Sequence, residues 1–193
     1  AVGPAILMAR MRRAGADPVL PNDRPAGLAI GLGGIGLRLQ DLMAIYASIA
    51  RGGQAVPLVW EADTGPEFAS RPPVLSPVAA GYVGDILSDV PAPPTAPQHA
   101  VAYKTGTSYG HRDVWAIGFD GRHTVGVWMG RADGAAMPGQ LGVGLAAPLL
   151  FDLFAAIKPV LDPLPAPPDA ALTVSTDQLP KGLQQFRRPG VLD

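Results

Sequence analysis

Apolar side chains recur every three or four residues in four stretches of the chain, which predicts four helices. We place them at residues 4–14, 39–50, 76–87 and 146–157. Gly52-Gly53 follows the second as a C-terminal stop, and Pro77 fits the first turn of the third. The predicted apolar sides are Val78, Tyr82 and Ile86 in the third helix and Leu149, Leu150, Leu153, Phe154 and Ile157 in the fourth, which should cover a sheet.

Stretches rich in β-branched and aromatic residues predict strands at residues 57–60, 101–108, 114–119 and 124–129. Between the last two, Asp120-Gly121 is typical of a tight hairpin turn, so we expect these strands to be antiparallel neighbours. The order of elements predicts an α+β fold, in which an antiparallel sheet of at least three strands is flanked by helices.

Prolines divide the chain in two places. Four of them stiffen residues 90–98, which we expect to form an extended connector outside the sheet. Beyond Pro159, prolines recur without a hydrophobic period. We therefore expect one domain at residues 1–160 and a Pro-rich linker at residues 161–193.

The composition suits one packed domain and narrows its partners. The chain has 193 residues, of which 48% are hydrophobic and 16% charged. A formal net charge of −1 argues against nucleic acid as a partner. The absence of cysteine excludes disulfides and thiolate metal ligands. The most apolar stretch, residues 141–157, contains Pro148 and Asp152, so we expect no membrane span.

The run Gly31-Leu32-Gly33-Gly34-Ile35-Gly36 fits the G-x-G-x-x-G pattern of dinucleotide-binding loops. It precedes a predicted helix and follows Leu28-Ala29-Ile30, which we expect to be a short strand. No second βαβ unit follows, although dinucleotide-binding folds contain one. We therefore favour a tight glycine turn that lets the next helix pack closely, and we expect no cofactor.

The three histidines, His99, His111 and His123, are too widely spaced to form a metal pair on one element. No acidic cluster accompanies them in the sequence, so we predict loop histidines and no metal site. Arg187-Arg188 is too short for a nucleic-acid patch, and we assign it no role.

The segment Lys104-Thr105-Gly106-Thr107-Ser108 places a cation, a residue without a side chain and three hydroxyls on one predicted strand. Acyl transfer involving a peptide with a terminal carboxylate has a use for each of them. Lys104 would supply positive potential for a serine nucleophile and a carboxylate, and Gly106 would give a substrate backbone clearance. Thr105 and Thr107 can hydrogen-bond the carboxylate, and the Thr107 N–H is a candidate for half of an oxyanion hole.

Two considerations weigh against this interpretation. Strand alternation places Lys104 and Gly106 on one face and Thr105 and Thr107 on the other, unless twist at a sheet edge brings them together. Taken alone, the segment also fits an ordinary surface strand with an exposed lysine.

Over residues 3–159 the chain resembles the penicillin-binding proteins of the bifunctional class A type. The resemblance rests on a colinear series of segments: 28–36, 41–53, 75–77, 102–122 and 125–131. It implies a partial transpeptidase domain of the penicillin-binding and β-lactamase-like fold, with residues 1–160 as the C-terminal part of that domain. In this family the Lys-Thr-Gly strand borders the active-site cleft, and the glycine run becomes a loop before a helix.

The resemblance also implies a reaction. In this family a serine attacks the penultimate D-Ala carbonyl of a peptidoglycan stem peptide, expels the last D-Ala and passes the acyl group to an amine. Penicillins and other β-lactams mimic the D-Ala-D-Ala end. By position, Lys104 would serve electrostatics and proton shuttling and Thr107 the oxyanion hole, while the substrate would be bound by Thr105, Gly106, Thr107 and Ser108.

The resemblance implies a parent protein at the periplasmic face of the cytoplasmic membrane. Its N-terminal anchor and its glycosyltransferase domain would both lie outside this sequence. The printed chain begins Ala1-Val2-Gly3-Pro4, without the features of a signal peptide, and we expect it to be cut from a longer protein.

The sequence departs from the family at the nucleophile. Family members carry Ser-x-x-Lys and Ser-x-Asn, but no serine here has a lysine three residues on or an asparagine two residues on. We expect both motifs upstream, and we expect this chain alone to be inactive and not to be acylated by penicillin.

Two other interpretations stay open. The first is a non-catalytic binding or scaffold domain that uses Lys104 and Thr107 only to hold a carboxylate. The second is a serine β-lactamase or carboxypeptidase relative, which would release the acyl group to water. The class A-like run at residues 110–130 argues against the second.

Overall fold

The computed structural model describes residues 3–20, 25–55, 57–59, 72–137 and 144–172, together with Val174, Gln178 and Lys181. In this part of the chain all four predicted helices form, and so do three of the five predicted strands. The elements are α1 (Pro4–Arg13), a 3₁₀ helix η2 (Leu28–Leu32), α2 (Leu39–Ala50), α3 (Pro77–Ser88), β1 (Ala102–Thr107), β2 (Asp113–Phe119), β3 (Thr124–Gly130) and α4 (Ala146–Ile157).

The three strands form one antiparallel sheet in the order β1-β2-β3. The sequence predicted only β2 and β3 to be antiparallel neighbours. β1 pairs with β2 as an outer strand of the same sheet. The predicted hairpin turn between β2 and β3 is confirmed, and Asp120 shapes it. Its amide donates to the His123 carbonyl at 3.1 Å, and its carboxylate accepts the amides of Arg122 at 2.8 Å and His123 at 2.6 Å.

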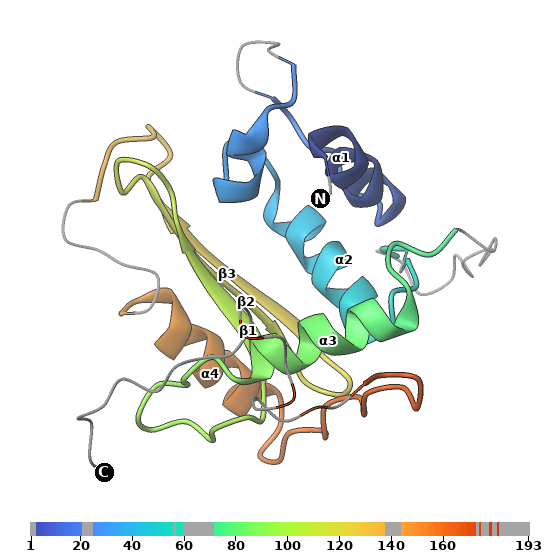
Figure 1. Ribbon diagram of the computed structural model, residues 1–193. Helices are drawn as coiled ribbons and strands as arrows, with labels where there is room; N and C mark the ends of the chain where they lie inside the picture. Colours follow the sequence, from blue (N-terminus) through green and yellow to red (C-terminus); the bar gives the residue numbers. More distant parts are fainter. Residues whose placement is uncertain are drawn as a thin grey trace.

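The sheet lies between α4 on one face and α2 on the other (Figure 1). Strand alternation explains the two layers, because Val125 and Val127 point toward α4 while the intervening Gly126 points toward α2. A Cβ at Gly126 would lie 2.8 Å from Leu39 and 2.9 Å from Met43 of α2. A glycine in β3 therefore allows α2 to approach the sheet closely, and the predicted α+β fold is confirmed.

The core lies between the sheet and α4. Tyr103 packs edge-on against Phe151, with ring centroids 5.1 Å apart and planes at 86°. Leu150 and Phe154 are buried in the same cluster, as predicted, but the predicted apolar side of α4 is shifted. Leu149, Leu153 and Ile157 are 41, 38 and 50% exposed, because the helix turns Ala146, Ala147 and Phe151 toward the sheet instead.

The apolar side predicted for α3 is also wrong in part. Tyr82 and Ile86 are exposed, and the buried residue of this helix is Ala80. The start of α3 follows the prediction, because Pro77 is in the first turn and the Ser76 hydroxyl accepts the Ala79 amide at 3.2 Å.

Three other local predictions fail. The residues predicted as a short strand before the glycines form the 3₁₀ helix η2 instead. Residues 57–59 have no regular structure, and Trp60 lies outside the described residues. The connector at residues 90–98 stays outside the sheet, but it is not extended. It folds back on itself, since the Gln98 side chain bonds both the amide (3.0 Å) and the carbonyl (3.3 Å) of Ala92.

Beyond α4 the chain turns back along the domain and runs beside α3 (Figure 1). No helix among the described residues is long and apolar enough to cross a membrane. Arg187-Arg188 lies outside the described residues.

Candidate functional site

β1 is an outer strand, and this position places its second half on an open edge. The Ser108 amide donates to the Asp113 carbonyl at 2.9 Å, which fixes the phase of the ladder with β2. In an antiparallel ladder alternate residues bond the partner strand, so the backbone N–H groups of Thr105 and Thr107 are directed away from β2. The edge therefore presents main-chain groups of these threonines as well as their side chains.

A cleft of about 1010 Å³ runs along this edge. All five residues of the Lys104-Thr105-Gly106-Thr107-Ser108 segment line it, although alternation puts them on two faces of the strand. An outer strand resolves that difficulty, because both of its faces meet at the exposed edge. The opposite wall comes from the glycine run and α2, with Leu32, Gly33, Gly34, Ile35, Gly36, Arg38, Leu39, Leu42 and Tyr46.

Lys104 is exposed, and its ammonium group donates to the Thr105 carbonyl at 2.9 Å. It makes no salt bridge with a described residue. Gly106 has room, because an added Cβ would come no closer than 3.7 Å to Trp115. Packing within the chain therefore does not require glycine at this position. The Ser108 hydroxyl accepts the Asp113 amide at 2.8 Å, which commits its oxygen to the turn after β1.

Aromatic residues that the sequence analysis had not given a binding role form the back wall of the cleft. Trp115 on β2 lies opposite Trp128 on β3, with ring centroids 6.2 Å apart. The Trp128 indole N–H donates to an Asp113 carboxylate oxygen at 2.9 Å, which holds the ring in place. Burial raises the pKa of the Tyr46 hydroxyl, which also lines the cleft, to about 12. The register of the β2–β3 hairpin places both indoles on one face, and the register of β1 with β2 places Lys104 on that same face.

The loop after β1 is held in a defined conformation. His111 has a positive φ of 55°, which is unusual for a residue other than glycine, and it follows Gly110 at 76°. The His111 amide donates to the Ser108 carbonyl at 3.0 Å, and its own carbonyl accepts the Met137 amide at 2.7 Å. Tyr109, at the tip of this loop, is fully exposed beside the cleft.

The glycine run forms a turn as predicted, but the element that packs closely against it is not the predicted helix α2. Gly33 ends η2 in the left-handed region with a φ of 86°. A Cβ at Gly34 would lie 2.8 Å from the Ala29 carbonyl oxygen, so the glycine packs against η2 instead of α2. Gly36 pairs with Val19 in an isolated bridge. A 3₁₀ helix before the run and an antiparallel sheet after it do not form the βαβ unit of a dinucleotide site.

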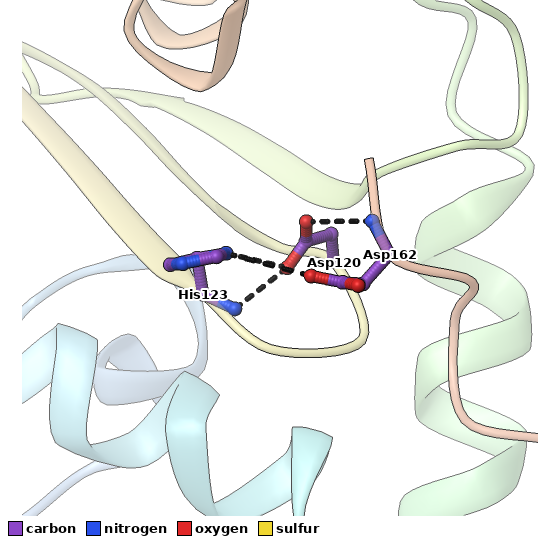
Figure 2. A group of neighbouring side chains, drawn as sticks. All are labelled: Asp120, His123 and Asp162. Atoms are coloured by element: carbon purple, nitrogen blue, oxygen red, sulfur yellow. Dashed lines mark hydrogen bonds and ion pairs between the residues drawn. The ribbon is translucent and has the colours of Figure 1, made fainter. Parts of the chain in front are cut away.

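The prediction that no acidic cluster accompanies the histidines is wrong for His123. Its Nδ1 lies 3.4 Å from an Asp120 carboxylate oxygen and 3.9 Å from an Asp162 carboxylate oxygen (Figure 2). These donor atoms lie within 4.8 Å of one another, close enough to be considered as metal ligands. However, Asp120 already accepts three backbone amides, and Lys158 binds Asp162 at 2.6 Å. The sequence does not indicate this cluster, because Asp162 is distant in the sequence from Asp120 and His123.

Comparisons with known proteins identify relatives of the chain. No protein-family model matches it. Penicillin-binding protein 1C of Escherichia coli (strain K12) is 41% identical over 154 residues, which is 78% of this chain and 20% of that protein. The crystal structure of penicillin-binding protein 1A from Haemophilus influenzae superposes with a TM-score of 0.56 and 16% identity. That match covers 82% of this chain and 32% of the other, and it supports the fold alone.

Proposed function

The chain belongs to the penicillin-binding proteins, as a relative of the 1C type, and from this premise we propose that it forms the substrate-strand side of a peptidoglycan D,D-transpeptidase domain. One observation carries the proposal: the Lys104-Thr105-Gly106-Thr107-Ser108 segment lies on an outer strand and lines a cleft of about 1010 Å³. The ligand would be the D-Ala-D-Ala end of a stem peptide, and β-lactams would bind as its mimics.

The roles of the residues follow from the geometry of the edge. The Lys104 ammonium would attract the terminal carboxylate and stabilise a deprotonated serine. The hydroxyls of Thr105 and Thr107 would donate to the carboxylate, and the Thr107 N–H would donate to the developing oxyanion. The substrate backbone would lie against the edge at Gly106, where there is no side chain to obstruct it.

The nucleophile would come from outside the printed sequence. Its hydroxyl oxygen would bond the penultimate D-Ala carbonyl carbon, the last D-Ala would leave with the serine proton, and an amine would then take the acyl group and release the serine. Ser48 is an unsuitable substitute, because it is buried in α2 and donates to the Ala44 carbonyl at 2.8 Å.

The whole protein would be larger than this chain, which spans 20% of the length of its 1C relative. We propose that it is a membrane-anchored protein of the periplasm, with a glycosyltransferase domain in addition to the transpeptidase. Residues 1–160 would be the C-terminal part of the transpeptidase domain.

A fluorescent penicillin tests the proposal that the serine nucleophile lies outside the printed sequence. Incubated with the isolated chain, it should form no covalent adduct, because the chain has no serine followed by lysine at the third position. A stoichiometric adduct at any serine would contradict the proposal. Reading the coding sequence upstream for Ser-x-x-Lys and then Ser-x-Asn tests the same point independently.

The absence of these motifs from the printed sequence favours one other candidate, a non-catalytic domain that binds peptide carboxylates. Calorimetry with a D-Ala-D-Ala peptide separates the two. Half of a transpeptidase site should bind with a Kd of about 1 mM or weaker, whereas a dedicated binding domain should reach the micromolar range.

A further inference from the structure

The segment after α4 contacts the domain at three separate points. We refer to residues 162–172 as the clasp segment. At its start, the Asp162 amide donates to an Asp120 carboxylate oxygen at 3.1 Å, and the Asp162 carbonyl accepts the Gly121 amide at 3.1 Å. The Lys158 ammonium lies 2.6 Å from an Asp162 carboxylate oxygen. His123 Nδ1 lies 3.9 Å from the same oxygen (Figure 2). The β2–β3 turn therefore anchors this end of the segment by backbone and side-chain bonds.

The middle of the clasp segment lies against a surface of α3 that has little side-chain volume. A Cβ at Gly81 would lie 2.8 Å from Cδ of Pro168. At the β2–β3 turn, a Cβ at Gly121 would overlap the Pro163 carbonyl oxygen. Glycine at both positions leaves space for the passing chain, and a side chain at either would force the segment away.

The far end of the clasp segment is bound by Tyr82. The tyrosine hydroxyl accepts the Leu172 amide at 2.7 Å and donates to the Leu172 carbonyl at 3.2 Å. Tyr82 is exposed on α3, so burial does not account for its position. Recognition of the clasp backbone supplies a reason for a tyrosine at this site.

These contacts point to a specific interaction surface. We propose that α3 and the β2–β3 turn form a receptor for a proline-rich segment, and that its occupant is the clasp segment of the same chain, which ends in a turn closed by the Ala171 amide and the Pro168 carbonyl. On this proposal the segment belongs to the folded domain and not to the Pro-rich linker predicted at residues 161–193. Prolines favour such docking, because a chain that is already extended loses little conformational entropy when it binds.

The clasp segment also closes the end of the sheet that is remote from the candidate cleft. Phe119, the last residue of β2, is 2% exposed. Phe119 lines a cavity of about 360 Å³ together with Ala80, Gly81 and Gly84 of α3. Residues 164–168 of the clasp segment line the same cavity. This role does not depend on the proposed function, because no residue of the clasp segment lines the cleft beside Lys104.

Two glycines of α3 provide a matched pair of variants in the full chain. Gly81→Ala would place its methyl group against Pro168, whereas a Cβ at Gly84 would come no closer than 3.8 Å to Phe119. Both changes raise helix propensity equally, so a difference in Leu172 amide exchange between the two variants reports on contact with the clasp segment. Amide hydrogen exchange of Leu172, measured by NMR, follows the far end of the segment.

We expect Gly81→Ala to accelerate Leu172 exchange by about tenfold or more relative to Gly84→Ala. Tyr82→Phe removes the acceptor of the Leu172 amide without adding volume, and it should accelerate the same exchange in a folded protein. In Gly81→Ala and in Tyr82→Phe, the amides of Gly121 and Asp162 should stay protected from exchange. Their acceptors, the Asp162 carbonyl and the Asp120 carboxylate, are not altered by these substitutions. Equal Leu172 exchange in the Gly81→Ala and Gly84→Ala proteins, or no protection of Leu172 in the unaltered chain, would overturn the proposal.

Discussion

The two halves of β1 differ sharply, although they belong to one strand of six residues. Ala102 and Tyr103 are 0 and 1% exposed, whereas Lys104 and Thr107 are exposed. The first half is covered by α3 and the proline connector, where the Tyr103 hydroxyl donates to the Pro91 carbonyl at 2.6 Å. The second half faces the cleft. The packing of neighbouring elements therefore distinguishes a half of β1 that is part of the core from a half that lines the cleft.

The largest expected effect comes from adjacent alanine substitutions across this divide. Tyr103→Ala removes a ring packed on Phe151 and should lower the free energy of unfolding by about 3 to 5 kcal/mol. Lys104→Ala removes an exposed side chain and should change it by no more than about 0.5 kcal/mol. Denaturant unfolding of both variants checks the contrast. Similar losses in the two proteins would show that the division is wrong.

Glycines of β2 and β1 give a second, smaller contrast. A Cβ at Gly118 would lie 2.7 Å from Cβ of Tyr103, in the closed half, so Gly118→Ala should cost about 1 to 3 kcal/mol by overpacking. Gly106 faces Trp115 in the open half, where an added Cβ would lie 3.7 Å from the nearest Trp115 atom, an ordinary van der Waals contact. Gly106→Ala should therefore leave the thermal midpoint nearly unchanged. A larger loss for Gly106→Ala than for Gly118→Ala would contradict the packing described for the two halves.

A third and smaller effect concerns pH and the turn beyond the closed half. Burial opposes ionisation of Asp120, but backbone amides of His123, Arg122 and Asp162 bond its carboxylate and hold its pKa below the usual value. A depressed folded pKa gives stability that is present above the unfolded pKa and is lost as pH falls through the folded value. The unfolding free energy should therefore decline below about pH 4, the unfolded pKa of an aspartate.

Asp120→Asn provides the control for this pH dependence. The amide keeps the shape of the side chain but cannot titrate, so the variant should be less stable at pH 7 and should lose less stability on acidification. Parallel stability curves for the two proteins between pH 2 and 7 would mean that Asp120 does not contribute.

The elements of the fold were largely predictable from the sequence, because their periodicity is local. The helices, the hairpin at Asp120-Gly121 and the three strands all follow from it. The buried sides of α3 and α4 were not predictable in the same way. Whether Tyr82 and Leu149 are buried depends on packing partners that are distant in the sequence. The 3₁₀ helix η2 replaced a predicted strand because five residues give too little pattern to distinguish the two.

The sequence indicated part of the lining of the candidate cleft. The segment around Lys104 was found from its residues, but alternation alone left its two faces unreconciled. Only the order of the strands, with β1 at the edge, shows how both faces meet one cleft. The indoles of Trp115 and Trp128, and the cluster of Asp120, His123 and Asp162, depend on cross-strand register and on the path of the chain after α4.

We propose that the open half of β1 recognises a peptide carboxylate. NMR titration of the chain with a peptide ending in D-Ala-D-Ala, and with the same peptide capped as an amide, tests it directly. The free carboxylate should shift the amides of Thr105, Gly106 and Thr107 while leaving Tyr103 unmoved, and the shifts should disappear with the capped peptide or in Lys104→Gln. Equal shifts with both peptides, or shifts confined to residues away from the cleft, would show that β1 does not recognise the carboxylate.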